Sequence, residues 1–256
     1  MNIATMPRGI DIASYQGRPD WDAVVASGIQ FAFTKVTEND GYVNPFFARN
    51  WAEMRRVGIH HGAYHFARPV GNDAAVEADY FLDHVEEQGP IQTGEMLVLD
   101  IEAGSGDLGP WALAWCERVK ERAGFSPIIY SGAWFTDPHG FPDDVGLAAY
   151  GLWLAAYGPT PPTPPAPWQF WAFWQYSDKG SVPGISGDVD LNMFNGPADR
   201  IALYGKPATD EPTEPDPPTV TLASVRAELV EYETHLAAAF DALQAEIAEI
   251  RASIPE

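Results

Sequence analysis

The chain has 256 residues, 46% of them hydrophobic and 12% aromatic, and a formal net charge of −21 at pH 7. This length allows one large domain with its own core plus an appendage, and the lack of Lys/Arg clusters argues against nucleic acid or anionic lipid as a partner. No run of about 18 apolar residues is present, so we expect no membrane span.

The N-terminus and the only cysteine give two further expectations. The sequence MNIATMPRGIDIA contains no apolar segment followed by a small-residue cleavage site, so we expect no secretory signal. Cys116 cannot form an internal disulfide and lies in a helical pattern, where a buried, inert thiol is expected.

Strand and helix patterns alternate through the first half of the chain. Short apolar runs predict strands at residues 9–14, 29–36, 58–68, 96–103 and 126–132. Helical periodicity predicts helices at residues 21–27, 44–57, 72–88 and about 109–123, the third of them capped by Asn72. Repeated βα units of this kind are typical of a parallel sheet, and their number favours a barrel over an open sheet.

The alternation breaks after the fifth strand. Residues 151–157, 170–176 and 189–194 have strand patterns, but the segment PTPPTPPAP at 159–167 cannot form a helix between the first two. We interpret this proline run as a connection within the domain, because a boundary there would leave aromatic-rich strands without a sheet to join. The expected catalytic domain therefore covers residues 1–205.

The character of the chain changes after Gly205. Residues 206–219 are rich in proline and acid, which predicts an extended linker. Residues 220–256 predict a long amphipathic helix, and its apolar residues recur with coiled-coil spacing: Leu222, Val225, Leu229, Tyr232, Leu236, Phe240, Leu243, Ile247, Ile250 and Ile254. We expect a homo-oligomer formed through residues 220–254; packing of the helix on its own barrel is the alternative.

Two acids in the fourth strand, MLVLDIEA, need a chemical reason. Asp100 and Glu102 are two residues apart, so their side chains share one strand face, roughly 6 to 7 Å apart. Burying both costs several kcal/mol unless they are hydrogen-bonded or one keeps its proton, and a retained proton is what a general acid requires. A pair satisfied by Arg or backbone amides is the structural alternative, but the spacing favours catalysis.

Two more acids lie on predicted strands at opposite ends of the domain, Asp11 on the first and Asp190 on the last. In a parallel barrel the carboxyl ends of all strands open on one face. We therefore expect these two acids to converge with Asp100 and Glu102 on one cleft.

Five separated motifs resemble the family-25 glycoside hydrolases, the Chalaropsis-type lysozymes that are common among bacteriophage endolysins. They are GIDIASYQG (9–17), GAYHFAR (62–68), LVLDIEA (97–103), WQYSD (174–178) and GDVDLNMF (187–194). The resemblance implies a TIM-like (β/α)5(β)3 barrel and cleavage of the β-1,4 bond between N-acetylmuramic acid and N-acetylglucosamine in bacterial peptidoglycan. It also implies synthesis in the cytoplasm of an infected host and action on the cell wall after release. No cofactor is expected.

The resemblance also implies residue roles. Glu102 matches the general acid/base and Asp100 the acid that orients the N-acetyl group of the substrate, while Asp11 and Asp190 match two supporting carboxylates. Tyr64 matches a tyrosine of the cleft. Retention with the acetamido group as internal nucleophile is favoured, and direct attack by a carboxylate is the alternative.

Other residues near strand ends are candidates for binding sugar. Flat apolar faces for sugar rings could come from Tyr130, Trp153, Trp171, Trp174 and Tyr176, although aromatic residues on barrel strands also serve as core. Lys35 and Gln175 are candidate hydrogen-bond donors in the cleft.

The histidines of the third strand are expected to bind no metal. The spacing of His60, His61 and His65 fits no metal-binding pattern, and no cysteine joins them. We instead expect His65 to line the sugar cleft.

Two rival functions differ in the acids that they require. Chitinase-like hydrolases carry D-x-x-D-x-D-x-E, but Glu95 and Val98 occupy the first two acid positions here. A non-catalytic sugar-binding barrel is expected to lack the acid at position 102, and Glu102 is present.

Overall fold

The computed structural model describes residues 3–208 of the chain. Its strands are β1 (Arg8–Ile12), β2 (Phe31–Glu38), β3 (Tyr42–Val43), β4 (His60–Phe66), β5 (Met96–Asp100), β6 (Ile128–Ser131), β7 (Gly151–Ala155), β8 (Phe173–Gly180) and β9 (Val189–Phe194). Its α-helices are α1 (Trp21–Ala26), α2 (Phe47–Val57), α3 (Ala74–Glu86), α4 (Gly109–Ala123) and α5 (Ala133–Thr136). Short 3-10 helices span Ile3–Thr5, Asp137–His139, Phe141–Asp143, Val145–Ala149 and Ala198–Tyr204. The expected linker beyond residue 208 and the expected helix at 220–256 lie outside the described residues.

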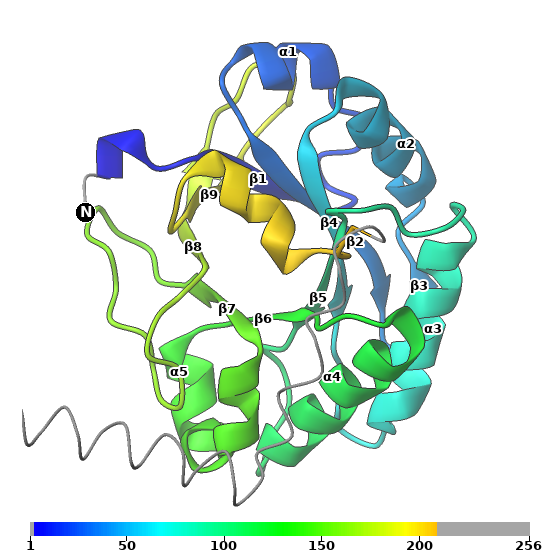
Figure 1. Ribbon diagram of the computed structural model, residues 1–256, viewed down its shortest axis with the longest axis vertical. Coiled ribbons are helices and arrows are strands. Elements are labelled where there is room, and N and C mark those ends of the chain that lie inside the picture. The colour runs from blue at the N-terminus through cyan, green and yellow to red at the C-terminus, as the bar shows by residue number, and fades with distance from the viewer. Residues whose placement is uncertain (1–2, 209–256) are drawn as a thin grey trace, which may run out of the picture. The chain divides into compact units, whose positions relative to one another are not determined.

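Eight of the strands close into a barrel, and the α-helices cover part of its outer face (Figure 1). Their order is β1-β9-β8-β7-β6-β5-β4-β2, and a β1–β2 pairing completes the ring, while β3 adds a short antiparallel edge to β2. The predicted barrel is thereby confirmed. Within residues 3–208, no α-helix lies between β7 and β9, in line with the proline run at 159–167, and no helix is long and apolar enough to cross a membrane.

The last strand, β9, runs antiparallel to both of its neighbours, β1 and β8. The expectation of an all-parallel barrel was wrong for this strand. Only residues 181–188 join β8 to β9, and a parallel connection needs a crossover of about a dozen residues or more. Because β9 is reversed, its first residues lie beside the carboxyl end of β1, and Asp190 stands directly opposite Asp11.

One predicted helix end agrees with the structure, and one predicted cap was wrong. Gly58 ends α2 in the left-handed conformation at φ 70°, which a glycine adopts without steric cost. The side chain of Asp73, and not that of Asn72, caps α3 by accepting hydrogen bonds from Ala75 N and Val76 N. Asn72 instead donates to the side chain of Asn39.

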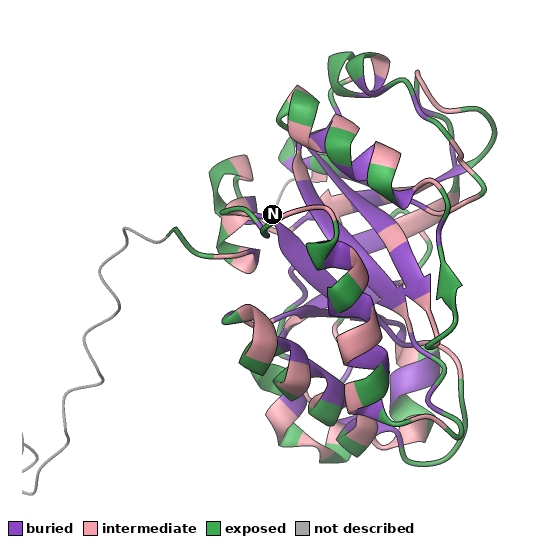
Figure 2. Cartoon of the chain, turned by 90° about the vertical axis from the view of Figure 1, so that its right-hand side faces the viewer, coloured by how far each residue is buried: buried purple, intermediate pink, exposed green. Residues whose placement is uncertain are grey.

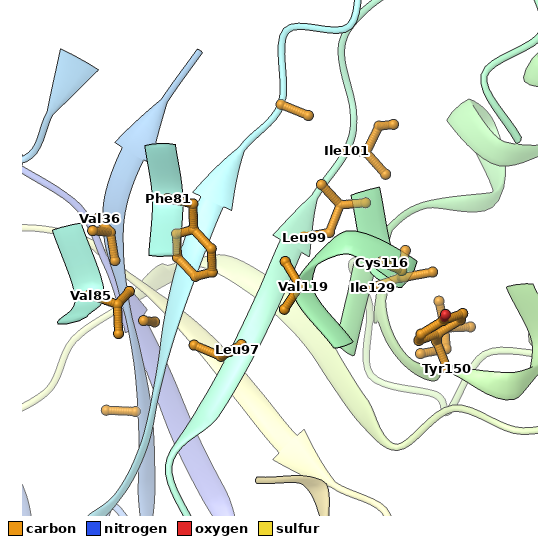
Figure 3. Close-up of a cluster of buried hydrophobic side chains, with 14 of the residues drawn as sticks. Val36, Phe81, Val85, Leu97, Leu99, Ile101, Cys116, Val119, Ile129 and Tyr150 are labelled. Carbon is orange, nitrogen blue, oxygen red and sulfur yellow. The ribbon is translucent and has the colours of Figure 1, made fainter. Parts of the chain in front are cut away.

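Two hydrophobic layers lie on opposite faces of the barrel wall, which is the most buried part of the fold (Figure 2). The outer layer packs the wall against the helices; Figure 3 shows Leu97 and Leu99 of β5 among side chains such as Phe81 and Val119. The buried Cys116 belongs to this outer layer, as expected.

Aromatic rings fill the inside of the barrel. Phe33 stacks on Trp153 with ring centroids 4.3 Å apart, and Phe173 meets Phe33 edge-on at 5.2 Å. Glycine provides the space for the Phe33 ring, because a Cβ at Gly62 would lie 2.6 Å from that ring. Inside the barrel, polar side chains therefore lie toward its two ends.

The end of the barrel at the amino termini of β5–β7 is closed by the 3-10 helix at Ala198–Tyr204, the gold helix in Figure 1. Tyr204 packs on Phe173 and Phe194, with ring centroids 5.5 and 5.8 Å apart. The chain then stays bound to this end, because Lys206 N donates to Glu95 O and Gly94 N donates to Lys206 O. Lys206, which we assigned to the linker, is thus still attached to the barrel.

A buried carboxylate, Glu95, joins several elements at this closed end. It accepts hydrogen bonds from Arg55 Nε (2.6 Å), Arg55 Nη2 (2.9 Å) and Gln92 N (2.8 Å), and it pairs with His61 Nε2 at 3.1 Å. Burial alone would raise the pKa of Glu95, but the bonds to His61, Arg55 and Gln92 hold that pKa at about 2. Glu95 therefore stabilises the folded state in its charged form.

We predict that Glu95→Gln lowers the free energy of unfolding by about 3 kcal/mol at pH 7, the scale that corresponds to the lowered pKa. Because the folded-state pKa is depressed, the wild-type advantage is present above the usual Glu pKa and is lost as the pH falls toward 2. Denaturant unfolding at pH 7 and pH 3 measures the difference. Glu53→Gln, which removes a surface ion pair with Arg56 on the same helix, should change stability little at both pH values. An equal loss at both pH values for Glu95→Gln would contradict the prediction.

Candidate active site

The carboxyl ends of the parallel strands surround an open cleft of about 360 Å³. It is lined by Asp11, Ala13, Tyr15, Gln16, Lys35, Glu38, Tyr64, Phe66, Arg68, Asp100, Glu102, Tyr130, Trp153, Tyr157, Gln175 and Asp190. The four predicted acids are all in this group. Segments that are far apart in the sequence thus meet at one end of the barrel.

Asp11 and Asp190 form a carboxyl pair across the antiparallel β1–β9 ladder. Burial, and then the charge of Asp190, raise the pKa of Asp11 well above its usual range. Burial also raises the pKa of Asp190, whereas a hydrogen bond from Asp11 lowers it. Asp11 consequently keeps its proton more readily than Asp190 and donates a hydrogen bond to the Asp190 carboxylate.

A network of hydrogen bonds fixes the carboxyl group of Asp11. Its Oδ1 accepts from Gln175 Nε2 at 3.0 Å and from Asn192 Nδ2 at 2.7 Å. The two amides are fixed in turn, since Tyr130 Oη donates to Gln175 Oε1 (2.8 Å) and Trp153 Nε1 donates to Asn192 Oδ1 (2.7 Å). This network orients the carboxyl group of Asp11 before any substrate binds.

Asp100 and Glu102 lie on the opposite wall of the cleft, at and just beyond the end of β5. Burial, and then the charge of Glu102, raise the pKa of Asp100 well above its usual range. Burial, and then the charge of Asp190, also raise the pKa of Glu102, against the charges of Lys35 and Arg68. Asp100 Oδ1 is buried and has no hydrogen-bond partner among the described residues. This wall therefore combines two carboxyl groups with raised pKa values and one buried carboxyl oxygen that accepts no hydrogen bond from the described part of the chain.

One side of the cleft mouth is positively charged. Glu38 lies between two cations, with Lys35 Nζ 2.5 Å and Arg68 Nη2 2.6 Å from its carboxylate oxygens. Both cations also lie over the ring of Phe66, at 4.6 and 4.5 Å from its centroid. Tyr64 lies deeper, where burial and the surrounding carboxylates raise the pKa of its hydroxyl well above its usual value.

Of the predicted substrate-binding residues, Tyr64, Lys35, Tyr130, Trp153 and Gln175 line the cleft, and His65, Trp171, Trp174 and Tyr176 do not. The placement of Tyr176 in the cleft was wrong, because Gln175 faces the interior and its neighbour on the strand points outward. Tyr176 packs beside Trp174 on the outer face, with ring centroids 5.6 Å apart. Trp153, only 2% exposed, mainly forms the floor.

His65 was misplaced for the same reason, since its neighbour Tyr64 faces the cleft. His65 is fully buried between β4 and the helices, where its ring nitrogens pair with Thr37 Oγ1 at 2.8 Å and Glu77 Oε2 at 2.8 Å. His61 is bonded to Ile59 O and Glu95 at the closed end. Within residues 3–208, no group of three or more His, Cys, Asp or Glu side chains is arranged to hold a metal ion.

Several cleft residues were not predicted from the sequence. Tyr15 is 92% exposed and Tyr157 is 60% exposed, so both rings remain accessible at the mouth of the cleft. Arg68 and Glu38 also belong to the rim. The signal for Asn192 was present, because it follows Asp190 by two residues on one strand, but loop residues such as Tyr15 and Tyr157 have no strand periodicity to indicate their direction.

Comparison with known proteins assigns the chain to a family. The model of glycosyl hydrolases family 25 matches residues 10–185. The chain belongs to glycosyl hydrolase family 25. Lysozyme M1 of Streptomyces globisporus is 35% identical over 206 residues, covering 76% of this chain and 69% of the relative. The uncharacterised protein YegX of Escherichia coli strain CFT073 is 38% identical over 205 residues, covering 75% and 71%.

A solved family structure has the same fold. The crystal structure of the bacterial lysozyme from Streptomyces coelicolor superposes with a TM-score of 0.71 at 35% identity, covering 78% of this chain and 97% of that one. The residues that the family model matches include β2 to β8 and three of the four cleft acids, Asp11, Asp100 and Glu102. Glycoside hydrolysis generally uses a proton donor for the leaving oxygen and negative charge near the sugar cation, and four acids line the cleft of this protein.

We predict that Asp11→Asn raises the melting temperature at pH 7. The folded-state pKa of Asp11 is raised, so the stability that its protonated form contributes is present below the usual Asp pKa and is lost as the pH rises. Asparagine keeps an acceptor for the two amide donors and a donor for Asp190 without this penalty. Thermal unfolding at pH 3.5 and pH 7 should give a gap between variant and wild type that grows with pH. Asp143→Asn, at an exposed position, is the control; an unfolded Asp11→Asn protein would assign Asp11 a purely structural role.

Proposed function

We propose that this chain is an N-acetylmuramidase that hydrolyses the β-1,4 bond between N-acetylmuramic acid and N-acetylglucosamine in peptidoglycan. The observation that carries the proposal is the convergence of four acids on one cleft in a family 25 barrel. Lysozyme M1 of Streptomyces globisporus, to which the chain is similar over most of its barrel, supports the substrate.

Glu102 is the proposed general acid/base. It is half-buried and faces the cleft, and its raised pKa keeps the proton that the leaving oxygen needs. After the glycosidic bond breaks, the ionised Glu102 can accept a proton from the incoming water. Ionised Asp190, whose charge acts on Glu102, is the proposed stabiliser of the oxocarbenium-like transition state, with Asp11 as its hydrogen-bonded partner.

Asp100 is proposed to orient the acetamido group of the muramic acid. Its buried, unpartnered Oδ1 is an acceptor for the acetamido N–H, and this bond would direct the acetamido oxygen toward the anomeric carbon. We therefore favour retention with the acetamido group as the internal nucleophile. Trapping a covalent glycosyl-enzyme ester would support the alternative, direct attack by a carboxylate.

We predict that Glu102→Gln lowers kcat by at least about 100-fold, the scale of general acid catalysis, while the fold and sugar binding persist. The wild-type rate should fall as the pH rises through the pKa of Glu102, because the proton needed for the leaving oxygen is then lost. Turbidity of Gram-positive cell walls, with analysis of new reducing ends, measures the activity. Glu121→Gln, which changes an exposed carboxylate on α4, is the control.

Two results would contradict this assignment. Near-native turnover by Glu102→Gln would remove the proposed acid from the mechanism. New reducing ends on N-acetylglucosamine instead of muramic acid would show that the wild-type enzyme cleaves a different bond.

We also propose that the protein serves as a phage endolysin, made in the cytoplasm of an infected host and acting on the wall after release. Similarity to the lysozyme of Streptococcus phage Cp-7, 32% identical over 155 residues, supports the role. Expression in a bacterial cytoplasm tests it: lysis should follow only when a membrane-permeabilising protein is produced at the same time.

Self-association through residues 220–254 is a further proposal, supported by the spacing of apolar residues in the sequence. We predict by light scattering that the intact chain is an oligomer and that a chain ending at Ala208, which keeps the bonds made by Lys206, is a monomer that still cleaves soluble glycan. Leu229→Asp with Leu236→Asp in the intact chain should also give monomers. A monomeric intact chain would contradict the proposal.

A further inference from the structure

A second groove, of about 210 Å³, adjoins the catalytic cleft. It is lined by Arg68, Pro69, Val70, Ala103 and Gly104, and Arg68 lines the cleft as well. The groove thus lies between the segment that follows β4 and the segment that begins directly after Glu102.

The two segments that form this groove are closely packed. A Cβ at Gly104 would lie 3.0 Å from Pro69 Cγ and 2.9 Å from Leu108 Cδ1, so the absence of a side chain allows this approach. The backbone of Arg68 is fixed from below, because Arg68 N donates to the buried Glu77 Oε2 at 3.1 Å. The groove is therefore preformed in the fold.

The groove has an apolar wall and a cationic end. Val70 is 66% exposed, while Pro69 is buried. The guanidinium of Arg68 bonds Glu38 through Nε and Nη2, at 2.8 and 2.6 Å, which leaves the Nη1 amino group for a ligand. Since Glu38 is shared between Arg68 and Lys35, this side of the cleft carries excess positive charge, opposite the acids at the other wall.

We propose that this groove is a subsite for the peptide attached to the lactyl group of muramic acid, with Arg68 binding a carboxylate of that peptide. The inference rests on the proposed muramidase function. The lactyl group is carried on carbon 3 of the ring, next to the acetamido group on carbon 2. Strand register places Phe66 beside Asp100, so a substituent next to an acetamido group held by Asp100 leads toward Arg68.

Charge and polarity support this occupant. A peptide carboxylate is repelled by ionised Asp190 in the cleft, and it is attracted by Arg68, whose planar donors suit carboxylates. Small aliphatic parts of the peptide can contact Pro69, Val70 and Ala103. Arg68 is also near the catalytic wall, because burial and Asp190 raise the pKa of Glu102 and the charges of Lys35 and Arg68 oppose that rise.

The test compares two forms of one substrate. Soluble glycan strands that carry peptide stems are measured beside the same strands after an amidase has removed the peptides and freed the lactyl carboxylates. For Arg68→Gln and for Val70→Asp, we expect kcat/KM on the peptide-bearing strands to fall about tenfold or more, the scale of a hydrogen bond to a charged group. On the stripped strands the loss should be several times smaller.

Control variants test whether the change in kcat/KM depends on the charge in the groove. Val70→Lys should preserve or raise the preference for peptide-bearing strands. Arg118→Gln, which removes another ion-paired arginine, and Val145→Asp, at a 79% exposed position outside both grooves, should leave the ratio of the two kcat/KM values unchanged.

The outcomes distinguish failure of the proposed peptide subsite from failure of the proposed muramidase function. Equal losses on both substrates, or no loss on either, would overturn the peptide subsite and leave the muramidase function standing. A larger loss on the stripped strands would also overturn it, because Arg68 would then bind the lactyl carboxylate itself. A wild-type enzyme that cleaves neither form would overturn the proposed function.

Discussion

The antiparallel pairing of β1 with β9 closes the barrel and also places the carboxyl groups of Asp11 and Asp190 opposite each other. Reversal of β9 is required by its short connection to β8, so the arrangement of charge in the cleft follows from chain connectivity. Two carboxyl groups that face each other in this way cannot both ionise without a large cost in free energy. The amides of Gln175 and Asn192 and the ring donors behind them hold the pair in place, and the cleft thereby retains protons at the end of an otherwise aromatic barrel interior.

The pKa values of buried acids shift in opposite directions at the two ends of the barrel. At the closed end, Glu95 is surrounded by Arg55, His61 and a backbone amide, and its pKa is about 2. At the open end, burial and neighbouring carboxylates raise the pKa values of Asp100 and Glu102. The groups around Glu95 stabilise the folded state. The clustered acids at the open end lower its stability, as is common at sites of catalysis. A carboxyl group in this protein is therefore structural or chemical according to whether cations or other acids surround it.

The regular part of the architecture was predictable from the sequence, and the exceptions have local causes. Five strands, the four helices between them and the helix-poor end followed from periodicity and from the proline run, and the D-x-E motif gave two of the cleft acids. Strand alternation, applied consistently, would have excluded His65 and Tyr176, because their neighbours Tyr64 and Gln175 face the interior. It could not have found Tyr15, Arg68 or Tyr157, which lie beyond strand ends where no period fixes the direction of a side chain. The reversed direction of β9 could not be inferred from loop length, because the predicted strand ended at residue 176 and left residues 177–188 as a connection about long enough for a parallel crossover.

The attachment of Lys206 beside Gly94 and Glu95 fixes where the described chain leaves the barrel. That point lies at the amino end of β5, whereas the cleft lies at the carboxyl end of the same strand. A long polymer can therefore cross the open face without meeting the exit of the polypeptide. For protein engineering, this makes the position after Ala208 a suitable junction for a fused reporter or for coupling to a solid support, because the attachment begins on the side away from the substrate.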